Sequence, residues 1–139
     1  MRGAKHFKNA INNNRHISDA LDSIPMDGMV RATDFHNYVE TFCEAFPDGG
    51  DGVAVATRLL CMKRPDVFVC LDSKNRAALC REFGIRQTSV PYDRYFEEII
   101  ERVQDTEWWN SPRPWDVETQ AIWEGRTALL DALYYGPNA

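Results

Sequence analysis

Only one stretch of this chain has the composition of a β-strand, the apolar run Val-Phe-Val-Cys-Leu at residues 67–71. Five apolar residues do not by themselves distinguish a strand from a buried turn or helix. A strand also needs a partner for its backbone groups, and no second run of this kind is evident in the sequence. We therefore expect residues 67–71 to form an extended or helical connection inside an all-α fold.

Elsewhere, apolar residues recur at three- and four-residue spacing, which is typical of amphipathic helices. We expect helices near residues 5–12 and 18–24 (one broken helix or two short ones, with Ser18 as a cap), 33–46 (capped by Thr33), 53–62, 73–83 and 116–134. A further helix is expected to begin at Ser89 or Asp93 and to have Val103 as its last inward residue. Their predicted inward residues include Phe35, Tyr38, Val39, Phe42, Cys43 and Phe46; Tyr95, Phe96, Ile99, Ile100 and Val103; and Ile122, Trp123, Leu129, Leu130 and Leu133. A chain of 139 residues fits a single core. The prediction is a mainly α protein, a compact single-domain bundle of six to seven helices spanning residues 1–139.

Composition excludes several classes of protein. No apolar run approaches the roughly 20 residues that cross a bilayer, and the N-terminus has no apolar signal core, so we expect a cytoplasmic protein. The four cysteines form no Cys-x-x-Cys pair, which favours buried free thiols over a zinc or redox motif. The three histidines are widely spaced and lack a ligand-like pattern of acids. We predict no metal site and no cofactor.

Asp72 stands where the apolar run ends and a basic helix is expected to begin. That helix should turn Lys74, Arg76 and Arg81 outward and end at Gly84. A carboxylate at a helix N-terminus is stabilised by free backbone amides and by the helix dipole. An ionised carboxylate can also stabilise a cationic transition state or orient a water molecule. Asp72 is therefore either a structural cap or a catalytic group. A capping role is by itself sufficient to explain an aspartate at this position.

Charge is unevenly distributed along the chain, although the net charge is only -5. Residues 1–57 carry five bases and eight acids (net -3), residues 58–86 seven bases and three acids (net +4), and residues 87–139 four bases and ten acids (net -6). A local positive field favours contact with phosphate or with an acidic partner. We therefore predict that Arg64, Lys74, Arg76 and Arg81 contribute to a binding surface.

An aromatic and proline-rich loop, residues 108–115, supplies four further candidate binding residues: Trp108, Trp109, Arg113 and Trp115. Aromatic rings and arginine are frequent binding anchors, and aromatic rings can stack on bases. The alternative is that the tryptophans pin a long loop to the core. The acids that follow position 96, such as Glu97, Glu98 and Glu101, either form a solvated helix face or imitate DNA phosphates toward a basic protein.

The segment 52–62, followed by Arg-Pro-Asp-Val-Phe-Val at residues 64–69 and then by Asp72, resembles the core of the helix-hairpin-helix DNA glycosylases over about residues 50–84. The resemblance implies a hairpin at Gly50 and Gly52 that binds DNA phosphates through backbone amides. It also implies that Asp72 assists loss of a base from its sugar.

Two functions are thus expected from the sequence. The first is a small non-catalytic binding module that engages DNA or a DNA-processing protein, in the manner of a phage or mobile-element accessory or inhibitor factor. The alternative is a DNA N-glycosylase-type hydrolase that uses Asp72.

Overall fold

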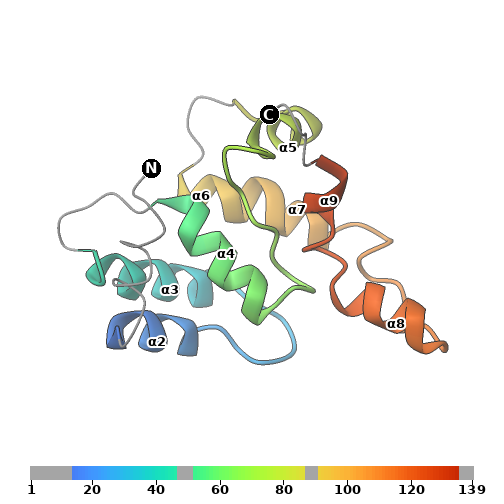
Figure 1. The fold of residues 1–139 in the computed structure, drawn as a ribbon, viewed down its shortest axis with the longest axis horizontal. Coiled ribbons are helices and arrows are strands. Elements are labelled where there is room, and N and C mark those ends of the chain that lie inside the picture. Colours follow the sequence, from blue (N-terminus) through green and yellow to red (C-terminus); the bar gives the residue numbers. More distant parts are fainter. Residues whose placement is uncertain (1–13, 47–51, 87–90, 135–139) are drawn as a thin grey trace. The chain divides into compact units, whose positions relative to one another are not determined.

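The structure is a computed structural model that describes residues 14–46, 52–86 and 91–134. Within these ranges it is mainly helical and has no strand, which confirms the all-α prediction (Figure 1). The described residues form seven helices if the continuous α6, η1 and α7 are counted as one. None of them combines the length and apolar character that crossing a bilayer requires. The chain divides into unit 1, Met1–Asp51, and unit 2, Gly52–Ala139, so the single-domain organisation stays a prediction and each unit is described by itself.

Unit 1 contains α2 (Arg15–Asp22) and α3 (Ala32–Glu44), while the helix expected near residues 5–12 lies outside the described residues. The predicted caps Ser18 and Thr33 are wrong, because both helices begin earlier. The side chain of Asn14 accepts a hydrogen bond from the His16 N–H at 3.0 Å and starts α2. At the start of α3, the carboxylate of Asp34 accepts the Arg31 N–H at 2.9 Å.

The core of unit 1 includes the predicted aromatic face of α3. Phe35, Tyr38 and Phe42 are fully buried, as expected from their spacing. The Phe42 ring lies 5.6 Å from the Tyr38 ring and 5.1 Å from the Phe46 ring, measured between centroids. Cys43 was expected on this face but is exposed, because it follows Phe42 directly and so points about 100° away around the helix.

Unit 2 contains α4 (Val53–Lys63), α5 (Arg76–Phe83), α6 (Tyr92–Tyr95), η1 (Phe96–Ile100), α7 (Glu101–Gln104), α8 (Val117–Glu124) and α9 (Leu130–Tyr134). The predicted inward residues of the helix at 92–104 are all buried, namely Tyr95, Phe96, Ile99, Ile100 and Val103. Of its predicted caps, Ser89 lies outside the described residues. α5 begins at Arg76 rather than Ser73, and it ends as predicted at Gly84, whose φ of 66° places it in the left-handed region that favours glycine.

The apolar run 67–71 is a buried connection and not a strand, as expected, and it forms no helix either. Because it has no strand partner, side chains bind several of its backbone groups. The hydroxyl of Thr57 on α4 accepts the Leu71 N–H at 2.9 Å. The hydroxyl of Tyr95 donates to the Val69 carbonyl at 2.7 Å. Side chains from α4 and α6 thus hold this connection in the interior of unit 2.

The predicted continuous helix over residues 116–134 is wrong, because the chain breaks after α8 at Gly125. The break is fixed by long-range bonds, in which the Ala128 N–H donates to the Pro65 carbonyl at 2.8 Å and the Thr127 hydroxyl donates to the Asp66 carbonyl at 2.5 Å.

The break also changes which residues of this region face the core. Ile122, Leu129 and Leu133 were expected to point inward but are exposed, and neither α8 nor α9 has a buried residue. α8 extends away from the other helices of unit 2 (Figure 1). A helix in that position leaves its apolar side chains uncovered.

Candidate functional site

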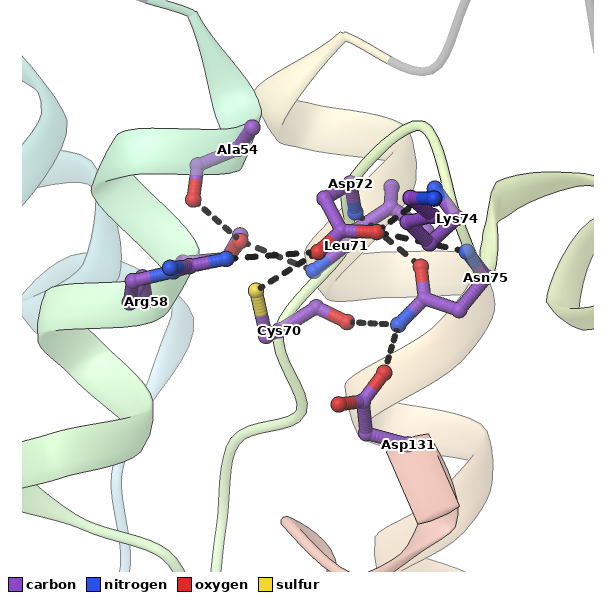
Figure 2. A network of polar contacts seen from close by, with 9 residues as sticks. Ala54, Arg58, Cys70, Leu71, Asp72, Lys74, Asn75 and Asp131 are labelled. Atoms are coloured by element: carbon purple, nitrogen blue, oxygen red, sulfur yellow. Dashed lines mark hydrogen bonds and ion pairs between the residues drawn. The ribbon is translucent and has the colours of Figure 1, made fainter. Parts of the chain in front are cut away.

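Asp72 lies between the buried run 67–71 and α5, at the centre of a network of polar contacts (Figure 2). Its Oδ1 atom accepts the N–H groups of Lys74 at 2.7 Å and Asn75 at 3.3 Å. Its backbone carbonyl accepts the Arg76 N–H at 3.0 Å, which leads the turn into α5. Asp72 therefore orders the turn that leads into α5, while Asn75 occupies the N-cap position of the helix.

The second carboxylate oxygen of Asp72 faces α4 and the buried run. Oδ2 lies 3.3 Å from Nη2 of Arg58 and 3.9 Å from Sγ of Cys70. The Asp72 side chain is only 15% exposed, whereas that of Arg58 is 60% exposed. Burial raises the pKa of the Cys70 thiol, and the Arg58 guanidinium beside it opposes that rise. The thiol is consequently protonated at neutral pH and serves as a weak donor, so partners within the chain engage both oxygens of Asp72.

Asn75 ties this network to α9, as Figure 2 shows. It is fully buried. Its Oδ1 atom accepts the Asp72 N–H at 3.0 Å, and its Nδ2 atom donates to the Cys70 carbonyl at 2.6 Å and to Oδ1 of Asp131 at 2.5 Å. One amide side chain therefore holds together the end of the buried run, the first turn before α5 and a helix more than fifty residues away.

The predicted basic residues do not all share one exposed surface. Lys74 and Arg81 are exposed, while Arg76 is half-buried and its Nε atom has no hydrogen-bond partner within the described part of the chain. The prediction that Arg64 belongs to this surface is wrong, because Arg64 is only 4% exposed. Its Nε and Nη2 atoms each lie 2.9 Å from a carboxylate oxygen of Asp66, a bidentate pair that neutralises the guanidinium.

The tryptophans of the 108–115 loop divide into a pinned group and an exposed group. Trp109 donates its indole N–H to the Asp66 carbonyl at 2.7 Å and to the Thr127 hydroxyl at 3.0 Å. The guanidinium carbon of Arg126 lies 4.5 Å from the Trp109 ring centroid and 4.3 Å from that of Trp123, a cation–π arrangement. Trp109 thus pins the loop to the unit.

In contrast, Trp108 is 43% exposed and Trp115 is 100% exposed. Arg113 is also exposed, but its Nη2 atom lies 3.0 Å from Oε1 of Glu124, so an acid on α8 already pairs with its charge. Of the four candidate residues in the loop, Trp108 and Trp115 remain accessible to a partner.

We use the term α8 surface for the exposed apolar residues Trp115, Val117 and Ile122 together with the exposed acids Asp116, Glu118 and Glu124. Val117 is 79% exposed and Ile122 is 61% exposed. Asp116 caps α8 by accepting the Thr119 N–H at 2.8 Å. Hydrogen bonding with the Thr119 side chain, and next with its backbone N–H, lowers the pKa of the Asp116 carboxyl. The α8 surface is therefore apolar and negatively charged at neutral pH.

The hairpin predicted at Gly50 and Gly52 is only partly described. Gly50 lies outside the described residues, and Gly52 is the exposed residue that precedes α4. The described ranges contain no group of three or more histidine, cysteine or acidic side chains arranged to hold a metal ion.

The sequence did not point to several residues of the Asp72 network and of the α8 surface, namely Arg58, Asn75, Asp131, Val117 and Ile122. One local signal was available, since Asn75 stands three residues after Asp72, the spacing of a reciprocal capping pair. The contacts of Arg58 and Asp131 join distant parts of the chain and leave no local pattern. No local pattern marks Val117 and Ile122 as exposed either.

Comparison with known proteins identifies no relative: no family model, no curated protein and no solved structure matches this chain.

Proposed function

We propose that this chain is a non-catalytic binding module that engages DNA or a DNA-processing protein through unit 2. The observation that carries the proposal is the complete exposure of Trp115 beside α8, a helix with no buried residue. Exposed apolar clusters on soluble domains commonly mark interaction sites, and tryptophan is enriched among residues that dominate binding energy. The setting we propose is a cytoplasmic accessory or inhibitor factor of a phage or mobile element.

The state of Asp72 supports a role other than catalysis. Two backbone N–H groups and Arg58 engage its carboxylate. A catalytic carboxylate must reach a substrate atom within hydrogen-bond distance. At Asp72, a substrate has to displace contacts that also begin α5, so the capping role is favoured.

The basic residues in and just before α5 support a nucleic-acid contact less strongly than the exposed apolar residues support a protein contact. Lys74 and Arg81 are exposed, but Glu82 is exposed between Arg81 and the end of the helix. The Lys74 and Asn75 amides, in the turn before α5, already bind the Asp72 carboxylate, so these two donors are not free to bind phosphate. A protein partner is therefore favoured over direct DNA binding.

The test is affinity capture on immobilised full-length protein from a lysate of its native host, with and without nuclease. We expect a protein that is retained after nuclease treatment and is lost with Trp115→Ala, while Lys74→Glu with Arg81→Glu has little effect. Retention that disappears with nuclease and with the charge-reversed pair would move the contact to DNA. The absence of any specific capture would refute the binding function.

A second candidate function, a DNA N-glycosylase-type hydrolase, is favoured by one observation. Asp72 lies at the turn that begins α5, the position that the resemblance to helix-hairpin-helix glycosylases implies for the aspartate. Its test is base release from duplexes that carry damaged or modified bases. This function requires activity in the wild type and its loss in a folded Asp72→Asn variant, whereas the binding function predicts no base release by either protein.

A further inference from the structure

The exposed residues around α8 have a charge pattern that selects among possible partners. Residues 105–124 contain five acids and one base, Arg113. All five acids are exposed: Asp105, Glu107, Asp116, Glu118 and Glu124. Arg113 pairs with Glu124, and among the described residues no lysine or arginine forms an ion pair with Asp116 or Glu118, the other two acids of the α8 surface.

This pattern disfavours nucleic acid as the occupant. DNA carries a phosphate about every 1.7 Å of its axis, and proteins bind it by neutralising that charge with lysine and arginine. Acids beside Trp115 repel phosphate and oppose stacking of a base on its indole ring. Burial of the exposed apolar residues is nevertheless favourable, since Val117, Ile122 and Trp115 each place branched or aromatic groups in water.

A basic protein surface can both cover the exposed apolar residues and pair with the acids beside them. Lysine and arginine carry charged ends on apolar stems, so a basic helix or ridge can cover the indole of Trp115 while its charges meet Asp116 and Glu118. Surfaces that bind nucleic acid have this composition. We propose that the α8 surface docks the basic, apolar face of a protein partner, the kind of face with which DNA-processing proteins contact nucleic acid. This inference rests on the proposed binding function and names the partner's chemistry.

The probe is a pair of amphipathic helical peptides that share their leucine positions, one with lysine and one with glutamate at every polar position. Each is titrated into full-length protein labelled with ¹⁵N, and the indole N–H resonances of its four tryptophans are followed. We expect the lysine peptide to shift the Trp115 resonance. Trp109 and Trp123, whose indole N–H groups already bond to Asp66 and Ser111, should move little. The glutamate peptide should bind at least about tenfold more weakly.

Two variants and two matched controls separate the α8 surface from the rest of the molecule. Val117→Ser with Ile122→Ser should weaken binding of the lysine peptide about tenfold or more, since each substitution removes apolar area. Glu118→Lys should weaken it several-fold and reduce its dependence on salt. Met62→Ser on α4, where Met62 is 77% exposed, and Glu97→Lys, at an exposed acid on η1, should leave the affinity unchanged.

Several results would overturn the inference. Equal binding of both peptides, or a shift of Trp115 with duplex DNA instead, would remove the basic protein as the occupant. A Trp115 indole resonance that shifts when the protein alone is diluted would identify a second copy of the chain as the occupant. Protection of that resonance from a soluble paramagnetic probe at every concentration would identify the chain's own residues as the occupant. The binding function itself stands or falls separately: continued capture of a host protein by the Val117→Ser, Ile122→Ser variant would overturn the docking surface alone.

Discussion

Replacing Asn75 by alanine should destabilise unit 2 more than any single surface substitution. The Asn75 side chain is fully buried and makes three hydrogen bonds. Its loss removes the partners of the Cys70 carbonyl and the Asp72 N–H, and each such group costs about 1–3 kcal/mol when left unsatisfied away from water. The two together give about 2–6 kcal/mol. Asp131 is half-buried, so water can replace its lost bond at little cost.

The assay is urea unfolding followed by far-ultraviolet circular dichroism and tryptophan fluorescence. Asn110→Ala is the matched control, because Asn110 is exposed and its Nδ2 atom donates to the Gln104 and Thr106 carbonyls at 2.7 and 2.8 Å. Water can replace those bonds, so we expect a loss below about 1 kcal/mol. Asn75→Asp tests whether shape alone matters, since it keeps the size of the side chain but removes both donors.

A loss below about 1 kcal/mol for Asn75→Ala, or one equal to that of Asn110→Ala, would refute this account of the network. Full stability of Asn75→Asp would refute it as well, since that variant has no amide donor for the Cys70 carbonyl.

Two further predictions concern buried groups beside this network. Tyr95→Phe removes the donor to the Val69 carbonyl and should cost about 1–3 kcal/mol in urea unfolding. Tyr134→Phe should cost little, because Tyr134 is the last residue of α9 and only half-buried, so that water can replace a partner of its hydroxyl. Equal losses would contradict the role of Tyr95. Burial raises the pKa of the Cys70 thiol, so at pH 8 Cys70 should react with iodoacetamide far more slowly than the exposed Cys43, as mass spectrometry can measure. Because the pKa of the thiol is raised in the folded state, its contribution to the free energy of unfolding should be complete below the unfolded pKa of about 8.5 and should fall as pH rises above that value. Rapid alkylation of Cys70 in the folded protein would contradict the burial of the thiol.

The sequence predicted those elements whose signal is local. The aromatic face of α3 and the inward side of residues 92–104 follow from three- and four-residue spacing alone. The end of α5 at Gly84 follows from the tolerance of glycine for positive φ. Residues 67–71 were correctly expected to lack a strand partner, although the side chains that bind their backbone were not foreseen.

The remainder depends on contacts between residues far apart in the chain. Spacing alone favoured one helix over residues 116–134, but the bonds from Thr127 and Ala128 to the turn at residues 65–66 break it. That break exposes the residues that spacing assigned to the core. The assignment of Arg64 to a surface failed for a different and local reason, because its charge was counted without its pairing to Asp66, only two residues away.

The most direct test of the central claim compares three proteins in one capture experiment from the native host: wild type, Val117→Ser with Ile122→Ser, and Asp72→Asn. All three should be shown to be folded by circular dichroism at the temperature of capture. If the α8 surface binds the partner, the α8 variant loses the host protein and Asp72→Asn retains it. Retention by the α8 variant together with loss in a folded Asp72→Asn variant would contradict the account and return the function to the carboxylate that begins α5.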